Sequence, residues 1–166
     1  MNRISRHEMW MQMAEVSAKR STCYRGNVGS LVILNRSILG IGYNGPPSGE
    51  VHCKGNSCER TSSGGCKRSI HAEVNALTQA GGELTTGYHH IVKAWDLYTT
   101  DSPCIDCAKL TLRYPVKRVF YRRPYRLRDG IELLVERRVG VYRMTPSGYV
   151  ISEESGMLID PVDMVL

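Results

Sequence analysis

Helix and strand patterns alternate along residues 71–144, and this alternation limits the fold of the 166-residue chain more than any other feature. Residues 30–35 and 37–44 precede it and are typical of a hairpin with its turn at Asn35-Arg36. A hairpin pairs antiparallel, whereas strands separated by helices pair in parallel, so the sheet is expected to be mixed. The elements predicted within the alternation are a helix (71–80), a strand (91–100), a helix (103–113), a strand (116–121), a helix (129–138) and a strand (139–144). The sequence therefore predicts an α/β fold of three layers, with five strands between helices on both faces.

The N-terminal segment is predicted to form a further helix. Ser5 and Glu8 have the spacing of a capping box, in which each residue binds a backbone N–H group near the start of the helix. The residues expected on its buried stripe are Trp10, Met13, Ala14 and Ser17. We expect one domain over residues 1–166, in which the turn-rich tail from 145 to 166 has no assigned structure.

The charge and the apolar content of the chain limit which partners and which cellular location can be expected. The net charge is +6 and the pI is near 9.1, so the surface would attract anions such as phosphorylated molecules. Charge alone leaves a nucleotide, a nucleic acid and a solvated basic face open. No apolar run approaches the roughly 18 residues that span a bilayer, and the N-terminus lacks a signal-peptide pattern. We therefore expect no membrane partner and a cytoplasmic location, or the host cytoplasm if the protein is viral.

Two short motifs carry the chemistry of the chain. His71-Ala72-Glu73 and Pro103-Cys104-Ile105-Asp106-Cys107 form the pattern H-x-E…P-C-x-x-C, which is typical of zinc-dependent base deaminases. Both motifs fall at predicted helix starts, where the helix dipole favours a thiolate. Three ligands, His71, Cys104 and Cys107, leave a fourth tetrahedral position for water, as a catalytic zinc requires. A redox-active C-x-x-C pair is the alternative, but it does not explain why the chain also carries the H-x-E motif.

Glu73 is two residues from His71 and is expected near the metal rather than on it. Its predicted role is that of a proton shuttle. It would take a proton from the attacking water, deliver it to the ring nitrogen and later protonate the departing ammonia.

The chain resembles the cytidine deaminase-like superfamily at these motifs, and more narrowly the deoxycytidylate (dCMP) deaminases, including those of phages. The stretches that carry the narrower resemblance are CYRGNVGSLVI, GIGYNGPPSG, HAEVNAL and SPCIDCAKL, which span about residues 22 to 120 in the order of the family. The resemblance implies the cytidine deaminase-like fold and hydrolytic deamination of dCMP to dUMP and ammonia, which supplies dUMP for thymidylate synthesis. It also implies that His71, Cys104 and Cys107 hold the catalytic zinc and that Glu73 shuttles protons.

Further substrate contacts follow from the resemblance alone. Asn44 would bind the base or the deoxyribose, although a turn asparagine before Gly45 is the structural alternative. The Ala72 N–H group would meet the base carbonyl oxygen, and the Ser102 carbonyl would accept from the amino group that leaves. Tyr125 would pack on the pyrimidine. The alternative is that Tyr125 is a surface tyrosine among arginines.

The 5′-phosphate of the substrate needs cationic or N–H donors. The resemblance favours Arg25 and Asn27, in the loop before the first strand, as the phosphate contacts. The competing candidates are the arginines of residues 122–128.

Residues 45–69, here called the cysteine loop, are rich in Gly, Ser and Cys and are too long to lack an ordering element. The resemblance implies a second, structural zinc held by four cysteines, three of them in this loop: Cys23, Cys53, Cys58 and Cys66. Four thiolates close a tetrahedral shell, which would order the loop. A shell in which His52 replaces one cysteine is the second choice, and free or disulfide-bonded thiols are the third. His89 and His90 are assigned to a loop rather than to a metal.

The family also suggests regulation and assembly. Its members are commonly hexamers and often respond to dCTP and dTTP, so the resemblance implies a homo-oligomer under allosteric control, with Mg²⁺ accompanying a nucleotide effector. Residues 78–90 depart from the family, where a basic residue often follows the motif helix, and leave regulation open.

Two alternatives to dCMP deamination stay open. One is a deaminase of another cytosine or adenine substrate, in tRNA or single-stranded DNA, although such relatives usually lack the extra cysteines and the GYNG stretch. The other is a non-catalytic two-zinc module that binds nucleic acid, against which Glu73 argues. Nucleic acid is accordingly not the expected partner.

Overall fold

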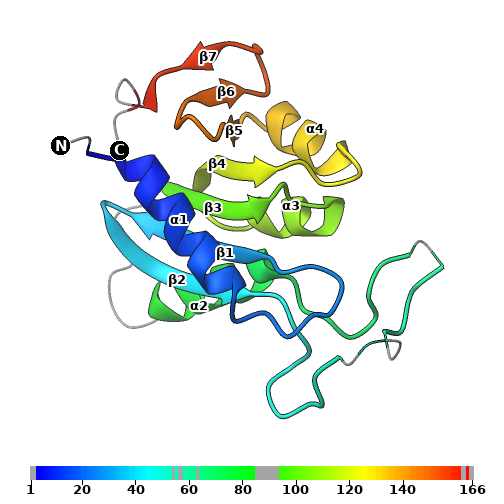
Figure 1. Cartoon of the computed structure of the whole chain (residues 1–166). Helices are drawn as coiled ribbons and strands as arrows, with labels where there is room; N and C mark the ends of the chain where they lie inside the picture. The colour runs from blue at the N-terminus through cyan, green and yellow to red at the C-terminus, as the bar shows by residue number, and fades with distance from the viewer. Residues whose placement is uncertain are drawn as a thin grey trace.

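The structure is a computed structural model that describes residues 3–53, 55, 58–62, 64–84, 94–161 and 164. Four helices and seven strands occur in these parts of the chain (Figure 1). The helices are α1 (Arg6–Ala18), α2 (Ala72–Leu84), α3 (Ile105–Thr111) and α4 (Asp129–Glu136). The strands are β1 (Gly29–Leu34), β2 (Ser37–Tyr43), β3 (Trp95–Asp101), β4 (Val116–Arg123), β5 (Gly140–Met144), β6 (Val150–Ser152) and β7 (Leu158–Ile159).

All seven strands form one mixed sheet in the order β2-β1-β3-β4-β5-β6-β7. The strands β3, β4 and β5 are parallel, and the pairs on either side of them are antiparallel. The β1–β2 hairpin turns at Asn35 and Arg36, whose φ angles of 48° and 70° are the positive values that a two-residue hairpin turn of type I′ requires. The predicted mixed sheet and the predicted hairpin are therefore confirmed.

Helices cover both faces of the sheet, which confirms the three-layer α/β/α arrangement. On one face α1 packs on the sheet through Trp10, Met11 and Ala14, against a core that contains Leu31 and Tyr98. On the other face α2, α3 and α4 share a second core. Its buried residues include Ala76, Leu77, Ala80, Ala108, Ile131 and Leu134. Because β3 and β4 are parallel, their carboxyl ends lie at one edge of the sheet, beside the starts of α2 and α3 (Figure 1).

The predicted number of five strands is wrong, because the tail adds two strands to the sheet. β6 pairs with β5 and β7 pairs with β6, both antiparallel. These strands have three and two residues, which is too short for an alternating apolar pattern to appear in the sequence. Residues 150–152 and 158–159 of the tail, to which the sequence assigns no structure, therefore belong to the sheet.

The first helix confirms one half of the predicted capping box and corrects the buried stripe. The Ser5 side chain accepts a hydrogen bond from the Glu8 N–H group, at 3.1 Å. The Glu8 carboxylate instead pairs with Arg122 of β4, at 2.8 Å. Met13, which is predicted to be buried, is 38% exposed, and Met11 is fully buried instead. The side of α1 that faces the sheet includes Met11 and Ala18.

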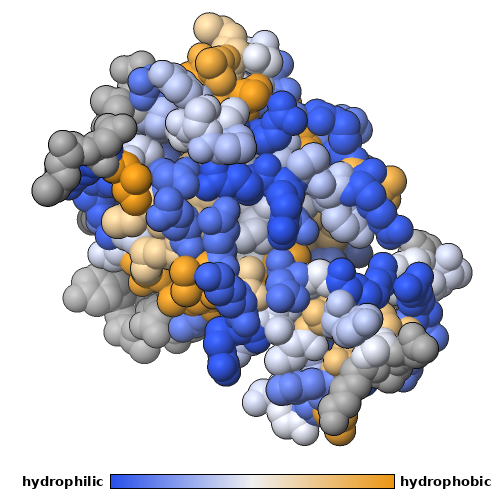
Figure 2. All heavy atoms as spheres, in the orientation of Figure 1, coloured by the Kyte–Doolittle hydropathy of each residue, from blue (hydrophilic) through white to orange (hydrophobic). Residues whose placement is uncertain are grey.

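Hydrophilic residues gather over the carboxyl ends of β3 and β4 on the face that α1 covers (Figure 2). Arginines at this edge are largely engaged: Arg122 pairs with Glu8 and Glu15, and Arg123 pairs with Asp101. None of the helices in the described part of the chain combines the length and the apolar character needed to span a bilayer.

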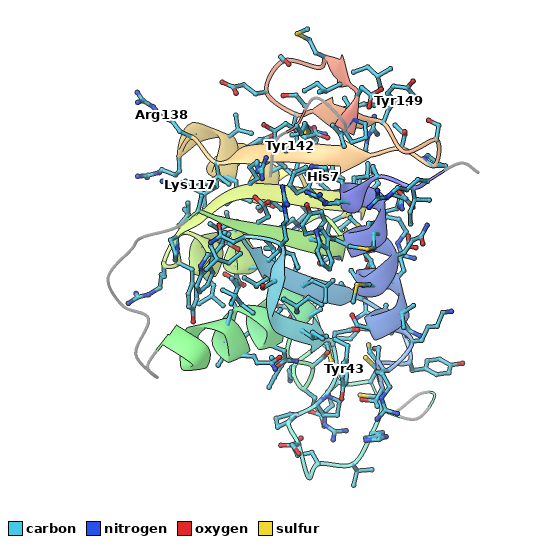
Figure 3. All side chains as sticks on the ribbon, turned by 90° about the vertical axis from the view of Figure 1, so that its left-hand side faces the viewer. His7, Tyr43, Lys117, Arg138, Tyr142 and Tyr149 are labelled. Carbon is cyan, nitrogen blue, oxygen red and sulfur yellow. The ribbon has the colours of Figure 1, made fainter. Side chains whose placement is uncertain are left out.

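His7 lies buried between α1 and the sheet, near Tyr142 (Figure 3). Its Nδ1 atom is 2.7 Å from the Tyr98 hydroxyl, and its Nε2 atom is 3.4 Å from the Met164 carbonyl oxygen. A neutral ring satisfies both contacts when Tyr98 donates to Nδ1 and Nε2–H donates to Met164. Burial lowers the pKa of His7, although the Met164 carbonyl opposes this effect.

The buried His7 predicts a fall in stability at acidic pH. Because its pKa is lower in the folded state, the unfolded chain binds more protons below about pH 6.5, so the free energy of unfolding falls as pH decreases through 6.5. One such group changes the free energy of unfolding by at most about 1.4 kcal/mol per pH unit. Urea denaturation of the wild type and of His7→Gln between pH 5.5 and 7.5 measures the effect. A variant with the same slope as the wild type would contradict it.

Candidate active site

The two chemical motifs occupy two helix starts that face each other. His71 immediately precedes α2, and its carbonyl accepts the first helical hydrogen bond, from Asn75 N–H at 3.2 Å. Cys104 is the N-cap of α3, and Cys107 lies within the first turn of that helix. The predicted helices therefore begin one or two residues later than expected, and Pro103 lies before α3 rather than in its first turn. Both helix dipoles direct their positive ends toward this point, which favours anionic groups there.

His71, Cys104 and Cys107 have the spacing of a tetrahedral metal site. The His71 Nδ1 atom lies 3.3 Å from Cys107 Sγ and 3.5 Å from Cys104 Sγ. Zinc bonds of about 2.0–2.1 Å to nitrogen and 2.3 Å to sulfur place tetrahedral ligands about 3.5 Å apart. Among the described residues these three form the only group of three or more His, Cys, Asp or Glu whose ligand atoms all lie within 4.8 Å. The donor set and its spacing therefore fit a zinc ion.

Without a bound cation, the protons of the three groups are arranged around one thiolate, Cys104. Hydrogen bonding from Cys107, and then from His71, lowers the pKa of Cys104 to about 3, which makes it a thiolate at neutral pH. The hydrogen bond with Cys104 raises the pKa of His71 to about 9. The hydrogen bond with Cys104, together with burial, raises the pKa of Cys107. A bound divalent cation deprotonates such a coordinating thiol outright.

Glu73 lies on the first turn of α2 and is 4% exposed. Burial raises the pKa of its carboxyl to about 7, against the opposing effect of nearby hydrogen-bond donors that include Cys107. A carboxyl with a pKa near the working pH can both accept and donate a proton. The structure thus places a buried carboxyl beside the three ligand atoms. The role of Glu73 as a proton shuttle stays a prediction.

Asn44 is buried and organises the loop before β1. Its Oδ1 atom accepts from Val28 N–H at 2.8 Å and from the Ser21 hydroxyl at 2.6 Å, and its Nδ2 atom donates to the Gly26 carbonyl at 2.9 Å. The amide oxygen is therefore occupied, and one N–H of Nδ2 is left for a further partner. The predicted contact of Asn44 with the base or deoxyribose stays a prediction.

The other predicted substrate contacts gather around the same helix starts. Ala72 is the first residue of α2 and is fully buried, so its N–H belongs to the first turn, where N–H groups lack partners within the helix. Ser102 follows β3, and its hydroxyl accepts from Tyr125 N–H at 2.7 Å, so Tyr125 is tied to the residue two before Cys104. The substrate roles of Ala72, Ser102 and Tyr125 stay predictions.

The structure separates the two predicted phosphate contacts and brings one of the competing arginines toward Arg25. The Arg25 guanidinium donates to the Gly64 carbonyl at 3.0 Å, in the cysteine loop. Asn27 instead lines a cavity of about 260 Å³ with Glu15, Lys19 and Arg123, beside α1. Arg126 is one of the competing arginines of residues 122–128. It stacks on Tyr125, and its guanidinium lies 3.3 Å from a Cβ built on Gly64.

The four remaining cysteines lie on two loops that meet below the sheet edge (Figure 1). The base of the cysteine loop is closed by two hydrogen bonds between Gly45 and Ile70, at 2.8 and 3.2 Å. Burial raises the pKa of the Cys53 thiol, and Cys66, Cys23 and Cys58 each add to this increase. The structure, which describes all four of these residues, does not bring three or more of their sulfur atoms within 4.8 Å of one another. His52 is exposed, and His89 and His90 lie outside the described residues.

Cys66 has the surroundings of a thiolate. Burial raises the pKa of Cys66, but the N–H groups of Arg68 and Ser69, with Cys58, outweigh it and hold the pKa below its usual value. The Ser69 N–H group lies 3.3 Å from the Cys66 sulfur. Hydrogen bonds from backbone N–H groups stabilise the charged form of a ligand.

Comparison with known proteins agrees with this geometry. Residues 4–123 match the model of the cytidine and deoxycytidylate deaminase zinc-binding region. The chain is 34% identical to the deoxycytidylate deaminase of Mycobacterium phage D29 over 133 residues, which cover 73% of this chain and 97% of the phage protein. It is 34% identical to ComE operon protein 2 of Bacillus subtilis over 138 residues, which cover 82% and 69% of the two chains.

A solved structure extends the likeness to the fold. The crystal structure of dCMP deaminase from the cyanophage S-TIM5, in complex with dCMP and dUMP, matches with a TM-score of 0.68 and 37% identity. The match covers 82% of this chain and 95% of the cyanophage chain. The match to the family model covers well over half of the chain and contains every ligand of the His71–Cys104–Cys107 group. The chain therefore belongs to the family of zinc-binding cytidine and deoxycytidylate deaminases.

Proposed function

We propose that the protein deaminates dCMP hydrolytically to dUMP and ammonia, with one zinc ion held by His71, Cys104 and Cys107. The observation that carries the proposal is the placement of buried Glu73 beside three ligand atoms within 4.8 Å of one another. Relatives named deoxycytidylate deaminase and a related structure that contains dCMP and dUMP support this choice of substrate. The dUMP formed would supply thymidylate synthesis.

The residues of the site divide the chemistry between them. When bound, zinc lowers the pKa of its water from 15.7 to about 7 and supplies a nucleophile at neutral pH. Glu73 accepts the proton of the attacking water and transfers it to the ring nitrogen N3 as the oxygen adds to C4. Glu73 then takes the remaining proton from the oxygen on C4 and delivers it to the amino group, so that the C4–N bond breaks, the C4 carbonyl forms and ammonia leaves. The Ala72 N–H and the Ser102 carbonyl would orient the base from the starts of α2 and α3.

Arg25 and Arg126 are proposed to bind the 5′-phosphate. Both guanidinium groups approach Gly64, that of Arg25 from the loop before β1 and that of Arg126 from the segment after β4. Guanidinium groups bind phosphate through paired N–H donors. This placement supports Arg126 as a partner of Arg25 in place of Asn27, which lines the separate cavity beside α1.

A substrate panel tests the function. Ammonia release from dCMP, deoxycytidine, dCTP and single-stranded DNA is measured on protein of known zinc content. We expect dCMP to be the preferred substrate and deoxycytidine to react poorly, because it lacks the phosphate that Arg25 and Arg126 would bind. Preferred reaction with single-stranded DNA would reassign the substrate to a polynucleotide, and inactivity toward all four at full zinc content would exclude a cytosine deaminase.

A second, structural zinc is proposed at Cys23, Cys53, Cys58 and Cys66. The support is the effect of Cys23, Cys58 and Cys66 on the pKa of Cys53, the hydrogen bond between Cys58 and Cys66, and the N–H donors around Cys66. Four thiolates leave no open position, which is the arrangement of structural zinc sites. Such an ion would hold together the loops that carry Arg25 and Gly64.

Replacing Cys58 by serine is expected to remove about one zinc per chain and to lower the thermal stability, because binding of a structural zinc contributes directly to folding. Metal analysis by mass spectrometry and thermal denaturation measure the two effects. His52→Gln serves as the control, because the exposed His52 is not a ligand in the all-cysteine shell. Unchanged zinc content in Cys58→Ser would exclude Cys58, and zinc loss in His52→Gln would identify a histidine ligand.

Regulation, assembly and location extend the proposal on the strength of the resemblance alone. We expect a homo-oligomer, hexameric in the manner of the family, with dCTP and dTTP as effectors and Mg²⁺ as the companion of a bound nucleotide. A cytoplasmic location is proposed because zinc-bound thiolates persist in a reducing compartment. Light scattering with and without dCTP, dTTP and Mg²⁺ tests the assembly and its effectors.

A further inference from the structure

Gly130, the second residue of α4, packs directly on the backbone that carries a proposed zinc ligand. A Cβ atom built on Gly130 would lie nearer than 3.0 Å to the Pro103 carbonyl oxygen, the Cys104 carbonyl carbon and the Cys104 carbonyl oxygen. Real Cβ atoms essentially never approach other atoms so closely. All three neighbours are backbone atoms, which cannot rotate away as a side chain does.

The need for glycine at position 130 comes from space rather than from backbone conformation. Gly130 does not have a positive φ, so alanine can adopt the same backbone angles. Glycine in a helix costs roughly 1 kcal/mol relative to alanine, and yet it stands in the first turn of this eight-residue helix. The close approach of α4 to the Pro103–Cys104 segment accounts for this residue.

The helix that bears Gly130 is firmly held. Ile131 and Leu134 are buried in the core that α4 shares with Ala108 of α3. The N-cap residue Arg128 pairs with Glu153, at 2.8 Å, and Glu153 lies directly after β6. The Tyr121 hydroxyl donates to the same carboxylate. The start of α4 is therefore fixed in place by its contact with Glu153, next to the C-terminal strands.

We infer that Gly130 is a positioning residue of the active site, which sets the place of Cys104 by letting α4 contact the backbone of that ligand. The inference rests on the proposed zinc site at His71, Cys104 and Cys107. It assigns a role in the site to α4 and to Glu153, both of which lie beyond the residues 4–123 that match the family. A methyl group at position 130 would push Cys104 away from His71 and Cys107.

Gly130→Ala tests this role, with Gly82→Ala as the matched control. Gly82 is also a helical glycine, but a Cβ built on it has no atom within 4 Å. Zinc release to a chromogenic chelator is expected to be about 10- to 100-fold faster in Gly130→Ala, which is the usual effect of losing the support of a metal ligand. The expected fall in kcat/KM for dCMP is about 100-fold, and it should arise in kcat. The visible spectrum of the Co²⁺-substituted protein should shift in Gly130→Ala and not in Gly82→Ala.

The outcomes separate positioning from a general packing effect. A folded Gly130→Ala protein with the zinc release rate and the Co²⁺ spectrum of the wild type would overturn the inference, even if its melting temperature were lower. If Gly130→Ala fails to fold, the inference is tested with Glu153→Gln, which removes the ion pair with Arg128. Glu154→Gln is its control, because Glu154 is exposed. Zinc release about two- to fivefold faster in Glu153→Gln, with no change in Glu154→Gln, supports the inference, and an unchanged rate in Glu153→Gln overturns it. Wild-type protein that holds no zinc at His71, Cys104 and Cys107 would instead refute the proposed function.

Discussion

Replacing Glu73 by glutamine is expected to lower kcat for dCMP deamination by about 10²- to 10⁴-fold while the zinc content stays at the wild-type value. Glutamine keeps the size of the side chain but cannot take up and return a proton. The loss should be so large because the 4% exposed carboxyl stands beside the ligand group and no water from bulk solvent replaces it easily. The zinc should remain because the three ligand atoms belong to other residues.

The Glu73→Gln experiment needs a control for the loss of one negative charge. Glu136→Gln at the exposed end of α4 makes the same chemical change away from the site and should retain wild-type activity. Steady-state kinetics and metal analysis are measured on the same preparations. Loss of one zinc from Glu73→Gln would make Glu73 a ligand, and unchanged kcat would remove it from the mechanism.

Replacing Gly42 by alanine is expected to lower the free energy of unfolding by about 1–3 kcal/mol and kcat/KM by about 100-fold. Gly42 of β2 lies against the first turn of α2, and a Cβ atom on it would come nearer than 3.0 Å to the Ala72 carbonyl oxygen and the Ala76 nitrogen. The helix would have to move away from the sheet. Because His71 precedes that turn and Glu73 lies in it, both would leave their places.

Other contacts between α2 and β2 oppose such a movement. The Asn75 side chain donates to the Tyr43 carbonyl, and the Gln79 side chain accepts from the Ile41 N–H group, each at 2.8 Å. Urea denaturation and dCMP kinetics of Gly42→Ala are compared with those of Gly26→Ala, because a Cβ on Gly26 has open space around it. Equal stability and activity in the two variants would show that α2 tolerates the displacement.

The sequence predicts that three candidate metal ligands lie together because their chemistry requires particular residue types at fixed spacings. His71, Cys104 and Cys107 are brought together by two helix starts that the apolar patterns also indicate. The layers and the mixed sheet follow from the alternation of helices and strands. These features depend on local patterns and on the rules by which strands connect.

Features that depend on contacts between distant segments could not be predicted in this way. The pairing of β6 and β7 with the sheet has no periodic signal, and the choice of Met11 over Met13 depends on how α1 is rotated on the sheet. The three hydrogen bonds of Asn44 within the loop before β1 become visible only in the structure. The approach of Arg126 to Gly64 joins two loops about sixty residues apart, and no motif marks it.

The conversion of dCMP to dUMP by zinc-loaded, zinc-free and zinc-reconstituted protein tests the central claim most directly. Product is followed by chromatography, and ammonia and bound zinc are measured on the same samples. We expect equal amounts of dUMP and ammonia, loss of both when the zinc is removed, and recovery when zinc is restored. Protein that carries its full zinc at His71, Cys104 and Cys107 and yet forms no dUMP would contradict it.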